Sequence, residues 1–201
     1  MHYSSEDIPA SLAYKLLAST IIPRPIALVT SVNKAGDVNA APFSFFNAMG
    51  IKPPVVVLGF VPNADGRDKD TPRNILETGE FVVHIVDEPL AKQMNMTAAT
   101  VPSEVDETQL AALQTTPSLA VAPPRLQAAP VGMECRLYND MELKGGGRII
   151  VGEVIHFHLR DDIITGTDPL RIDIDKLEPI SRLTGAKYAR ITDQFELVRP
   201  K

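Results

Sequence analysis

The sequence predicts a mainly β protein with peripheral helices, built as a barrel of short strands. Apolar runs that suit strands outnumber helical patterns, neighbouring runs are joined by short turns, and 17 prolines are spread along the 201 residues. Prolines at that frequency favour short strands over a helical bundle. The strand–helix alternation of a doubly wound nucleotide-binding fold is missing. No repeat, low-complexity tract or linker divides the chain, so we expect one domain over residues 1–201.

The first half of the chain contains one predicted helix and four predicted strands. PASLAYKLL (9–17) places leucines on one side of a short helix. The strand-like runs that follow are PIALVTSV (25–32), DVNAAPFSF (37–45), PPVVVLGF (53–60) and EFVVHIV (80–86). NKAGD (33–37) separates the first two runs, and its glycine indicates a hairpin.

The second half begins with two helical patterns and returns to strands. The helical patterns are VDEPLAKQMNM (86–96) and DETQLAALQ (106–114). Strands are expected in VGMECRLYNDMEL (131–143) and in GGGRIIVGEVIHFHL (145–159). The glycines at 145–147 precede a strand and lack the spacing of a phosphate-binding loop, so we exclude that motif. The segment from residue 181 onward is mixed and irregular.

Composition is ordinary for a globular protein and excludes several functional classes. Hydrophobic residues make up 44% and charged residues 22%. The net charge of −5 argues against a general nucleic-acid binder, which needs a clustered basic surface. The single cysteine, Cys135, excludes an internal disulfide and indicates a core thiol in its strand. With no secretory-type leader and no apolar run long enough to span a membrane, we expect a cytoplasmic protein.

RDKDTPRNI (67–75) is the most distinctive stretch of the chain. Thr71 suits a helix N-cap, Pro72 the first helical position, and Gly79 the end of the helix. The N–H groups of such a helix start, together with Lys69, suit a phosphate or carboxylate. The alternative is a capped surface helix whose charges are solvated.

Hydroxyls, an amide and aromatic rings gather at two strand ends. Thr30 and Ser31 lie near the end of one strand, and Ser44 and Asn47 follow the next, among three phenylalanines. This mixture suits a flat heteroaromatic ring, although ordinary strand-end turns also explain it. An anion site and a ring site together describe a phosphorylated aromatic cofactor.

The sequence resembles the flavin reductase-like FMN-binding split-barrel family, which includes flavoredoxin-like proteins. The similar stretches are RPIALVTSVNKAGDVNAAPFSFFNAMGIKPPVVVLGF, KDTPRNILETGEFVVHIV, LAKQMN, MECRLY, IIVGEVIHFHL and LTGAKYARI. Their order covers nearly the whole chain. The resemblance implies a six-stranded antiparallel split β-barrel, a homodimer, and FMN bound near the subunit interface.

The resemblance also implies which residues hold the cofactor. Nine positions match the family's FMN-site motifs: Arg24, Thr30, Ser31, Ser44, Phe45, Asn47, Lys69, Asp70 and Thr71. The KDT part would hold the phosphate through the Lys69 charge and the Thr71 hydroxyl. Thr30 and Ser31 match hydroxyls near the ribityl and phosphate groups. The segment from Ser44 to Asn47 would meet the isoalloxazine edge. Arg24 is either a cofactor or interface residue, or a structural partner of a carboxylate.

The sequence departs from the branch of the family that exchanges diffusible flavin. That branch carries an acidic residue and a histidine before the VGEV strand, whereas this chain has GGGR, which puts Arg148 in place of the histidine. The longer, flavoredoxin-like branch with retained FMN fits this chain better.

Three histidines and a tyrosine remain to be assigned. His156 and His158 share one face of a strand, where we expect a partly exposed pair; a metal site would need a further ligand, and no acidic or cysteine cluster joins them in the sequence. His84 lies in an apolar run and reads as a core or interface histidine. Tyr188 matches a family position near the active cleft, with packing as the alternative. We expect no metal.

The expected function is that of an FMN-dependent oxidoreductase that takes hydride from NAD(P)H and passes electrons to flavin or another small acceptor. The cofactor carries that chemistry, so no catalytic acid, base or nucleophile is assigned. The alternative is a non-enzymatic FMN-containing electron carrier between partner proteins. A third possibility is a split barrel that binds another ligand, such as pyridoxal phosphate or haem.

Overall fold

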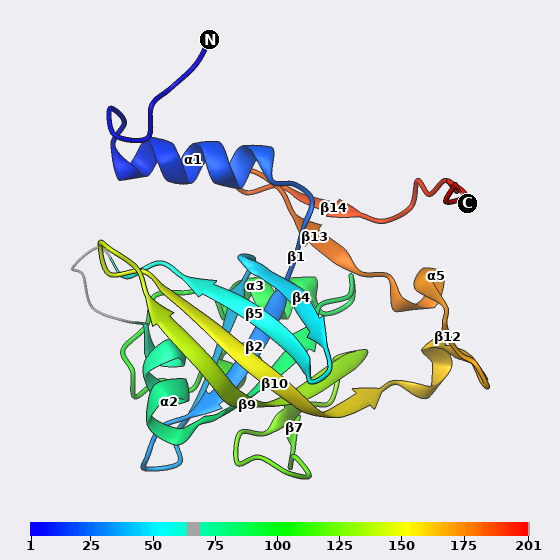
Figure 1. Cartoon of the computed structure of the whole chain (residues 1–201). Helices are drawn as coiled ribbons and strands as arrows, with labels where there is room; N and C mark the ends of the chain where they lie inside the picture. Colours follow the sequence, from blue (N-terminus) through cyan, green and yellow to red (C-terminus); the bar gives the residue numbers. More distant parts are fainter. Residues whose placement is uncertain (64–68, 201) are drawn as a thin grey trace.

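The computed structural model describes residues 1–63 and 69–200 and has one large antiparallel sheet at its centre (Figure 1). The strand order is β3-β2-β6-β9-β10-β5-β4, and every neighbouring pair is antiparallel. The strands are β2 (Ala27–Val32), β3 (Val38–Phe43), β4 (Phe46–Ile51), β5 (Pro54–Phe60), β6 (Glu80–Ile85), β9 (Val131–Glu142) and β10 (Arg148–Leu159). The predicted mainly β architecture is confirmed.

The sheet curls around a core without closing through hydrogen bonds. Strands β3 and β5 are far apart in the strand order, yet the rings of Phe43 and Phe60 meet edge to face with centroids 4.7 Å apart. Six strands were expected in the barrel, and the main sheet has seven. The additional strand is β4, which pairs antiparallel with β5 so that Phe46 lies opposite Leu58.

Helices lie at the periphery and are shorter than expected in the second half. They are α1 (Ala10–Thr20), α2 (Asp70–Thr78), α3 (Ala91–Met96), α4 (Glu107–Leu110), the 3-10 turn η1 (Asp161–Ile163) and α5 (Ile174–Leu177). The helical pattern at 106–114 gives only four helical residues because Ala112 takes a positive φ of 51°. None of the helices described is long and apolar enough to cross a membrane.

Short strands form three small sheets beside the main one. Sheet β1-β13-β14 joins β1 (Arg24–Pro25), β13 (Ile180–Arg182) and β14 (Tyr188–Arg190). The hairpins are β7 (Thr115–Thr116) with β8 (Arg125–Leu126), and β11 (Ile164–Thr167) with β12 (Leu170–Ile172). The segment 181–200, expected to be mixed and irregular, contains the last two residues of β13 and the whole of β14 and ends as an extended tail (Figure 1).

The core has two parts, which lie on opposite faces of β2. Ala27 and Val29 pack inside the curled sheet, whereas Leu28 packs outside it with Leu90 and Met94 of the α3 region. Successive side chains of a strand point to opposite faces, so β2 is buried on both. This explains its nearly uninterrupted apolar sequence.

Cys135 and His84 lie in the core, as the sequence analysis expected. Cys135 is fully buried inside the sheet, and burial raises the pKa of its thiol. His84 is also fully buried: its Nδ1–H donates to the Leu28 carbonyl at 2.9 Å, and its Nε2 accepts from the Leu126 N–H at 3.0 Å. These two bonds require a neutral ring. Burial lowers the pKa of His84 to about 4.

Candidate functional site

Helix α2 begins two residues earlier than its sequence suggested. It starts at Asp70, with Lys69 at the N-cap position and no side-chain cap, so the prediction that Thr71 caps the helix and Pro72 opens it was wrong. Asp70 instead pairs with Arg73 one turn on. Gly79 ends the helix as predicted, in the left-handed conformation with φ of 76°.

Thr71 does not cap the helix because a buried polar chain engages its hydroxyl oxygen. The Asn39 amide Nδ2 donates to Thr71 Oγ1 at 2.9 Å and lies 3.5 Å from Ser31 Oγ. Asn74 Nδ2 donates to Ser31 Oγ at 3.2 Å. Thr71 Oγ1 accepts from Asn39 and donates to no group among the described residues, so its proton can be offered to a ligand. Ser31 is linked to Thr71 through Asn39.

A cavity of about 190 Å³ opens at the start of α2, and we call it the α2 cleft. Three of the predicted residues line it together: Lys69, Asp70 and Thr71. Its other walls come from β3, through Asn39 and Phe43, from the loop 97–101 after α3, and from Glu107. The Lys69 ammonium lies 5.8 Å from the centre of the Phe43 ring, over its face. The cleft thus combines a cation, a hydroxyl, backbone donors and an apolar wall.

Sequence reasoning missed two polar side chains of this cleft. Asn39 is a buried amide in an otherwise apolar strand, and that exception to the pattern was the available signal. Glu107 is buried on α4 and accepts the Ala40 N–H at 3.0 Å. Burial raises the pKa of the Glu107 carboxyl. Glu107 lies far along the chain from the KDT motif, so no local pattern pointed to it.

A second cluster of predicted residues surrounds the buried Arg24. Its guanidinium donates to the carbonyls of Ala18 at 2.6 Å, Ile21 at 2.9 Å and Leu183 at 3.0 Å, and to Ser44 Oγ at 3.3 Å. The expected structural partner was a carboxylate, whereas the observed partners are carbonyls and a hydroxyl. Arg24 therefore fastens the end of α1 to the segment after β13.

Phe45 borders this Arg24 cluster. The centre of its ring lies 5.9 Å from the Arg24 guanidinium carbon and 6.0 Å from the centre of the Tyr14 ring. Phe43 of the α2 cleft is two residues earlier in the chain, so the two clusters follow one another along β3 and the turn after it.

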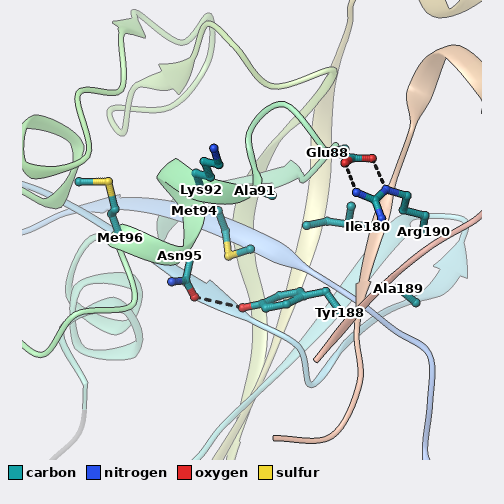
Figure 2. A pocket seen from close by; sticks show the side chains of 10 residues that line it. All are labelled: Glu88, Ala91, Lys92, Met94, Asn95, Met96, Ile180, Tyr188, Ala189 and Arg190. Carbon is teal, nitrogen blue, oxygen red and sulfur yellow. Dashed lines mark hydrogen bonds and ion pairs between the residues drawn. The ribbon is translucent and has the colours of Figure 1, made fainter. Parts of the chain in front are cut away.

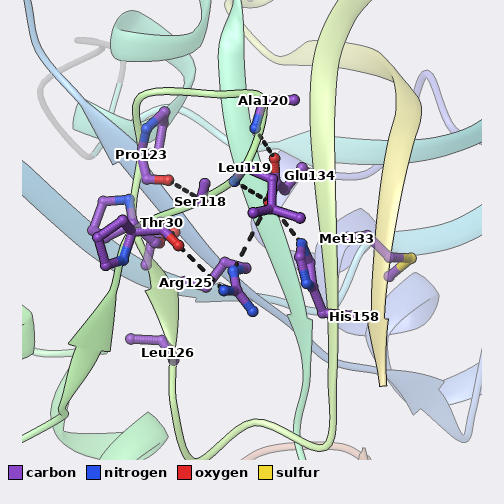
Figure 3. A network of polar contacts seen from close by, with 12 residues as sticks. Thr30, Ser118, Leu119, Ala120, Pro123, Arg125, Leu126, Met133, Glu134 and His158 are labelled. Carbon is purple, nitrogen blue, oxygen red and sulfur yellow. Dashed lines mark hydrogen bonds and ion pairs between the residues drawn. The ribbon is translucent and has the colours of Figure 1, made fainter. Parts of the chain in front are cut away.

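Two predicted residues, Thr30 and Asn47, lie at neither the α2 cleft nor the Arg24 cluster. Thr30 is buried and donates to the Pro124 carbonyl at 2.6 Å, on the side of the sheet shown in Figure 3. Its neighbour Ser31 faces α2, and adjacent residues of a strand cannot face the same side. Asn47 is exposed on β4, where its Oδ1 accepts the Ala48 N–H.

A larger hollow of about 390 Å³ lies between α3 and β14 (Figure 2). Its floor is apolar and includes Met94 and Ile180. The Tyr188 hydroxyl donates to Asn95 Oδ1 at 3.3 Å across one side, and Glu88 pairs with Arg190 at the rim. This wall of thioether, aliphatic and phenol groups suits a flat ring.

The hollow and the α2 cleft lie along the same segment. A shallow depression lined by residues 95, 96, 98 and 99 shares Asn95 and Met96 with the hollow, and Ala98 and Ala99 with the cleft. The hollow therefore borders α3, and the α2 cleft borders the loop that follows it.

The remaining polar residues of the sequence analysis also have defined partners. Arg148 pairs with Asp140 and Glu142 of β9, and Gly145 and Gly146 form the preceding turn with φ of 96° and 89°. His156 is exposed and its ring stacks near that of His158, as expected. One acidic group does reach this pair, because His158 Nε2 lies 2.7 Å from the buried Glu134. The described residues hold no group of three or more His, Cys, Asp or Glu that could bind a metal.

Comparison with known proteins agrees with this architecture. The family description "Flavin reductase like domain" matches residues 18–171. The crystal structure of nitrilotriacetate monooxygenase component B from Bacillus cereus is 38% identical with a TM-score of 0.92, and the match covers 98% of each chain. Pseudomonas fluorescens 2-nitrobenzoate 2-nitroreductase NbaA is 34% identical with a TM-score of 0.89, covering 100% of this chain and 96% of that one.

A third structure supports the fold alone. A flavin reductase with a split barrel domain from Shewanella frigidimarina is 18% identical with a TM-score of 0.83, and the match covers 100% of both chains. The curled antiparallel sheet, the match over residues 18–171 and these structures lead to one conclusion. The chain belongs to the flavin reductase-like family, with its split-barrel fold.

Proposed function

We propose that this protein is an FMN-binding oxidoreductase that accepts hydride from NAD(P)H and passes electrons to flavin or another small acceptor. The α2 cleft is the observation that carries the proposal, because its Lys69, Thr71 and helix start match what a phosphate monoester needs. When bound, FMN supplies the hydride and electron chemistry. The protein's residues bind and orient it.

The donors of the cleft fit a phosphate group. Pro72 has no N–H, so the backbone N–H groups at the start of α2 without a partner inside the helix are those of Lys69, Asp70 and Thr71. The Asp70 carboxylate would repel a phosphate, but its pairing with Arg73 offsets that charge. Asp70 would therefore contribute through its N–H, Thr71 through its hydroxyl and Lys69 through its charge.

The ring of the cofactor would extend from the cleft along the end of β3. Phe43 provides an apolar wall at the cleft, and Ser44 and Phe45 continue it beside Arg24. Arg24 has most of its donors engaged by carbonyls, so we assign it the role of fixing Ser44 and Phe45 in position. Asn47, exposed on the next strand, remains a candidate for the ring edge.

The second substrate would use the hollow between α3 and β14. Its apolar floor and the Tyr188–Asn95 pair suit a nicotinamide or another aromatic acceptor. The similarity to a 2-nitrobenzoate nitroreductase supports a small aromatic acceptor as one possibility. A hollow of this kind favours the enzyme over the electron carrier, which needs no site for a second small molecule.

We further propose that the protein is a homodimer and that residues 1–201 act as one domain. Helix α1 stands away from the main sheet, and of its side chains only Ala18 is buried (Figure 1). Tyr14, Leu17 and Ile21 are more than half exposed along and just after it. Exposed apolar residues in such a group favour burial by a second copy. Sedimentation that finds a monomer with tightly bound FMN would contradict an interface-linked site.

The first experiment is an absorbance spectrum of the protein as isolated. Bound oxidised FMN would make it yellow, whereas pyridoxal phosphate or haem would give its own spectrum. Stopped-flow mixing with NADH and NADPH then separates enzyme from carrier. Rapid bleaching by either nucleotide supports the oxidoreductase, and no bleaching by either supports the carrier.

A further inference from the structure

A separate polar cavity of about 240 Å³ lies between the β7–β8 hairpin and the ends of β9 and β10, and we call it the Arg125 cavity. The charged side chains that line it are Arg125 and Arg160, joined by the imidazole of His158. Thr116 and Gln127 add polar groups. Among the residues that line it, none carries a carboxylate. The α2 cleft shares none of these residues.

Glu134 lies behind Arg125 and His158 and holds these two side chains of the cavity in position (Figure 3). The carboxylate is fully buried, accepts the N–H groups of Leu119 and Ala120 at 2.7 Å, and lies 2.7 Å from His158 Nε2. Burial acts to raise the pKa of Glu134, but these hydrogen bonds outweigh it and lower the pKa. Glu134 is therefore an ionised group whose oxygens are engaged by two backbone amides and by His158.

Arg125 is the charged side chain of this cavity whose guanidinium still has a donor without a partner among the described residues. It forms an ion pair with the buried Glu134, with Nε 3.8 Å from Oε1, which is too long for a hydrogen bond, and its Nη2 donates to the Pro117 carbonyl at 3.2 Å. Nε is buried and has no hydrogen-bond partner within the described part of the chain. A buried donor without a partner is unfavourable, so an acceptor oxygen from a ligand would be stabilised here.

Arg160 differs from Arg125 in having every guanidinium nitrogen engaged. Nε donates to Asp162 at 2.6 Å, Nη1 to Asp87 at 2.9 Å, and Nη2 to the Lys176 carbonyl at 3.1 Å. Two carboxylates thus offset its charge from outside the cavity. Arg160 forms a fixed wall, and Arg125 remains the residue that can bind an anion.

We propose that the Arg125 cavity binds a compact organic anion through its carboxylate or phosphate group. The Arg125 guanidinium fork holds the oxyanion, and Thr116 and Gln127 lie within the same cavity to contact it. A volume of about 240 Å³ is below the size of a pocket for a drug-sized ligand, so the cavity suits a small metabolite.

The test is calorimetric titration of the FMN-saturated protein with inorganic phosphate and, separately, with succinate. FMN saturation keeps either probe from the α2 cleft, and Lys69→Ala protein without FMN provides the same test should the cofactor not bind. We expect saturable binding of at least one probe. The tighter probe identifies the anion as a phosphate or a carboxylate.

Arg125→Gln is the decisive variant and Arg136→Gln is its matched control. Arg136 is exposed and likewise donates to a loop carbonyl, that of Ala120, but it does not line the cavity. We expect Arg125→Gln to weaken binding at least tenfold, Arg125→Lys to weaken it less, and Arg136→Gln to leave it unchanged. Melting curves identify folded variants. Absence of binding of both probes to the parent at millimolar concentration overturns the proposal, as does equal binding by folded Arg125→Gln and Arg136→Gln.

Discussion

The α2 cleft and the Arg24 cluster contain similar residue types but differ in how their polar groups are bonded. Each combines a cation with a hydroxyl beside a phenylalanine. At Arg24 the guanidinium is buried and bonds to three carbonyls and Ser44. At the cleft Lys69 is exposed, and within the described part of the chain the Thr71 hydroxyl accepts from Asn39 and donates to no other group. The difference teaches that donors left without internal partners, rather than residue types, distinguish a binding site from a structural fastening.

Arg24→Ala should produce the largest loss of folding stability. The change leaves three carbonyls without their donor, and we expect the free energy of unfolding to fall by about 3 kcal/mol or more. Denaturant unfolding measures this loss, with Arg136→Ala as an exposed control expected to change it by less than about 0.5 kcal/mol. A folded Arg24→Ala protein with unchanged stability but lost FMN affinity would show that Arg24 binds the cofactor and does not stabilise the fold.

His84, like Arg24, is buried and hydrogen-bonded inside the protein, and its lowered pKa makes folding stability depend on pH. Its pKa is lowered to about 4, so between that pH and about 6.5 the unfolded chain binds a proton that the folded chain does not. Stability therefore rises with pH across this window, by about 3 kcal/mol in total. His84→Gln cannot titrate and should flatten this part of the curve. Parent and variant curves of the same slope would show that other groups cause it.

Lys69→Ala should act on FMN affinity and leave folding stability nearly unchanged. A charge-assisted hydrogen bond to phosphate contributes about 1.5–3 kcal/mol, so the dissociation constant should rise roughly tenfold to a hundredfold. Lys34→Ala, in the exposed turn between β2 and β3, is the matched control and should bind FMN like the parent. If Lys69→Ala also bound like the parent, the cleft would revert to a solvated helix start.

Thr71→Val should have a smaller effect that appears in both measurements. The valine keeps the shape of the side chain but leaves the buried Asn39 amide without its 2.9 Å acceptor, which costs about 1–2 kcal/mol of stability. The lost hydroxyl also weakens FMN binding. Thr71→Ser retains the hydroxyl and should recover most of both losses. Equal behaviour of the Ser and Val variants would show that the hydroxyl has no role.

The sequence was sufficient for six of the seven strands of the main sheet and for bringing the residues of the KDT motif to one cleft. The strands at β2, β3, β5, β6, β9 and β10 were predicted because their apolar runs are bounded by turns. Strand β4 was missed because FNAMGI has little β-branched or alternating character. It is a strand because it pairs with β5.

Contacts between distant segments could not be predicted from local patterns. The prediction that Thr71 caps α2 was wrong because Asn39, on strand β3, engages the Thr71 oxygen. Glu134 meets His158 because β9 and β10 pair with a register shift that sets His158 opposite Gly132. A single sequence gives the apolar faces of strands, whereas register and bulges depend on the whole sheet. The Arg125 cavity arises from those features and left no local motif.

The most direct test of the account compares FMN with riboflavin, which lacks the phosphate. Fluorescence titration of the parent should give tighter binding of FMN by about tenfold or more, since only FMN can use Lys69 and Thr71. In Lys69→Ala the difference between the two flavins should shrink, with riboflavin affinity unchanged. Equal affinity of the parent for FMN and riboflavin would contradict the assignment of the α2 cleft as a phosphate site.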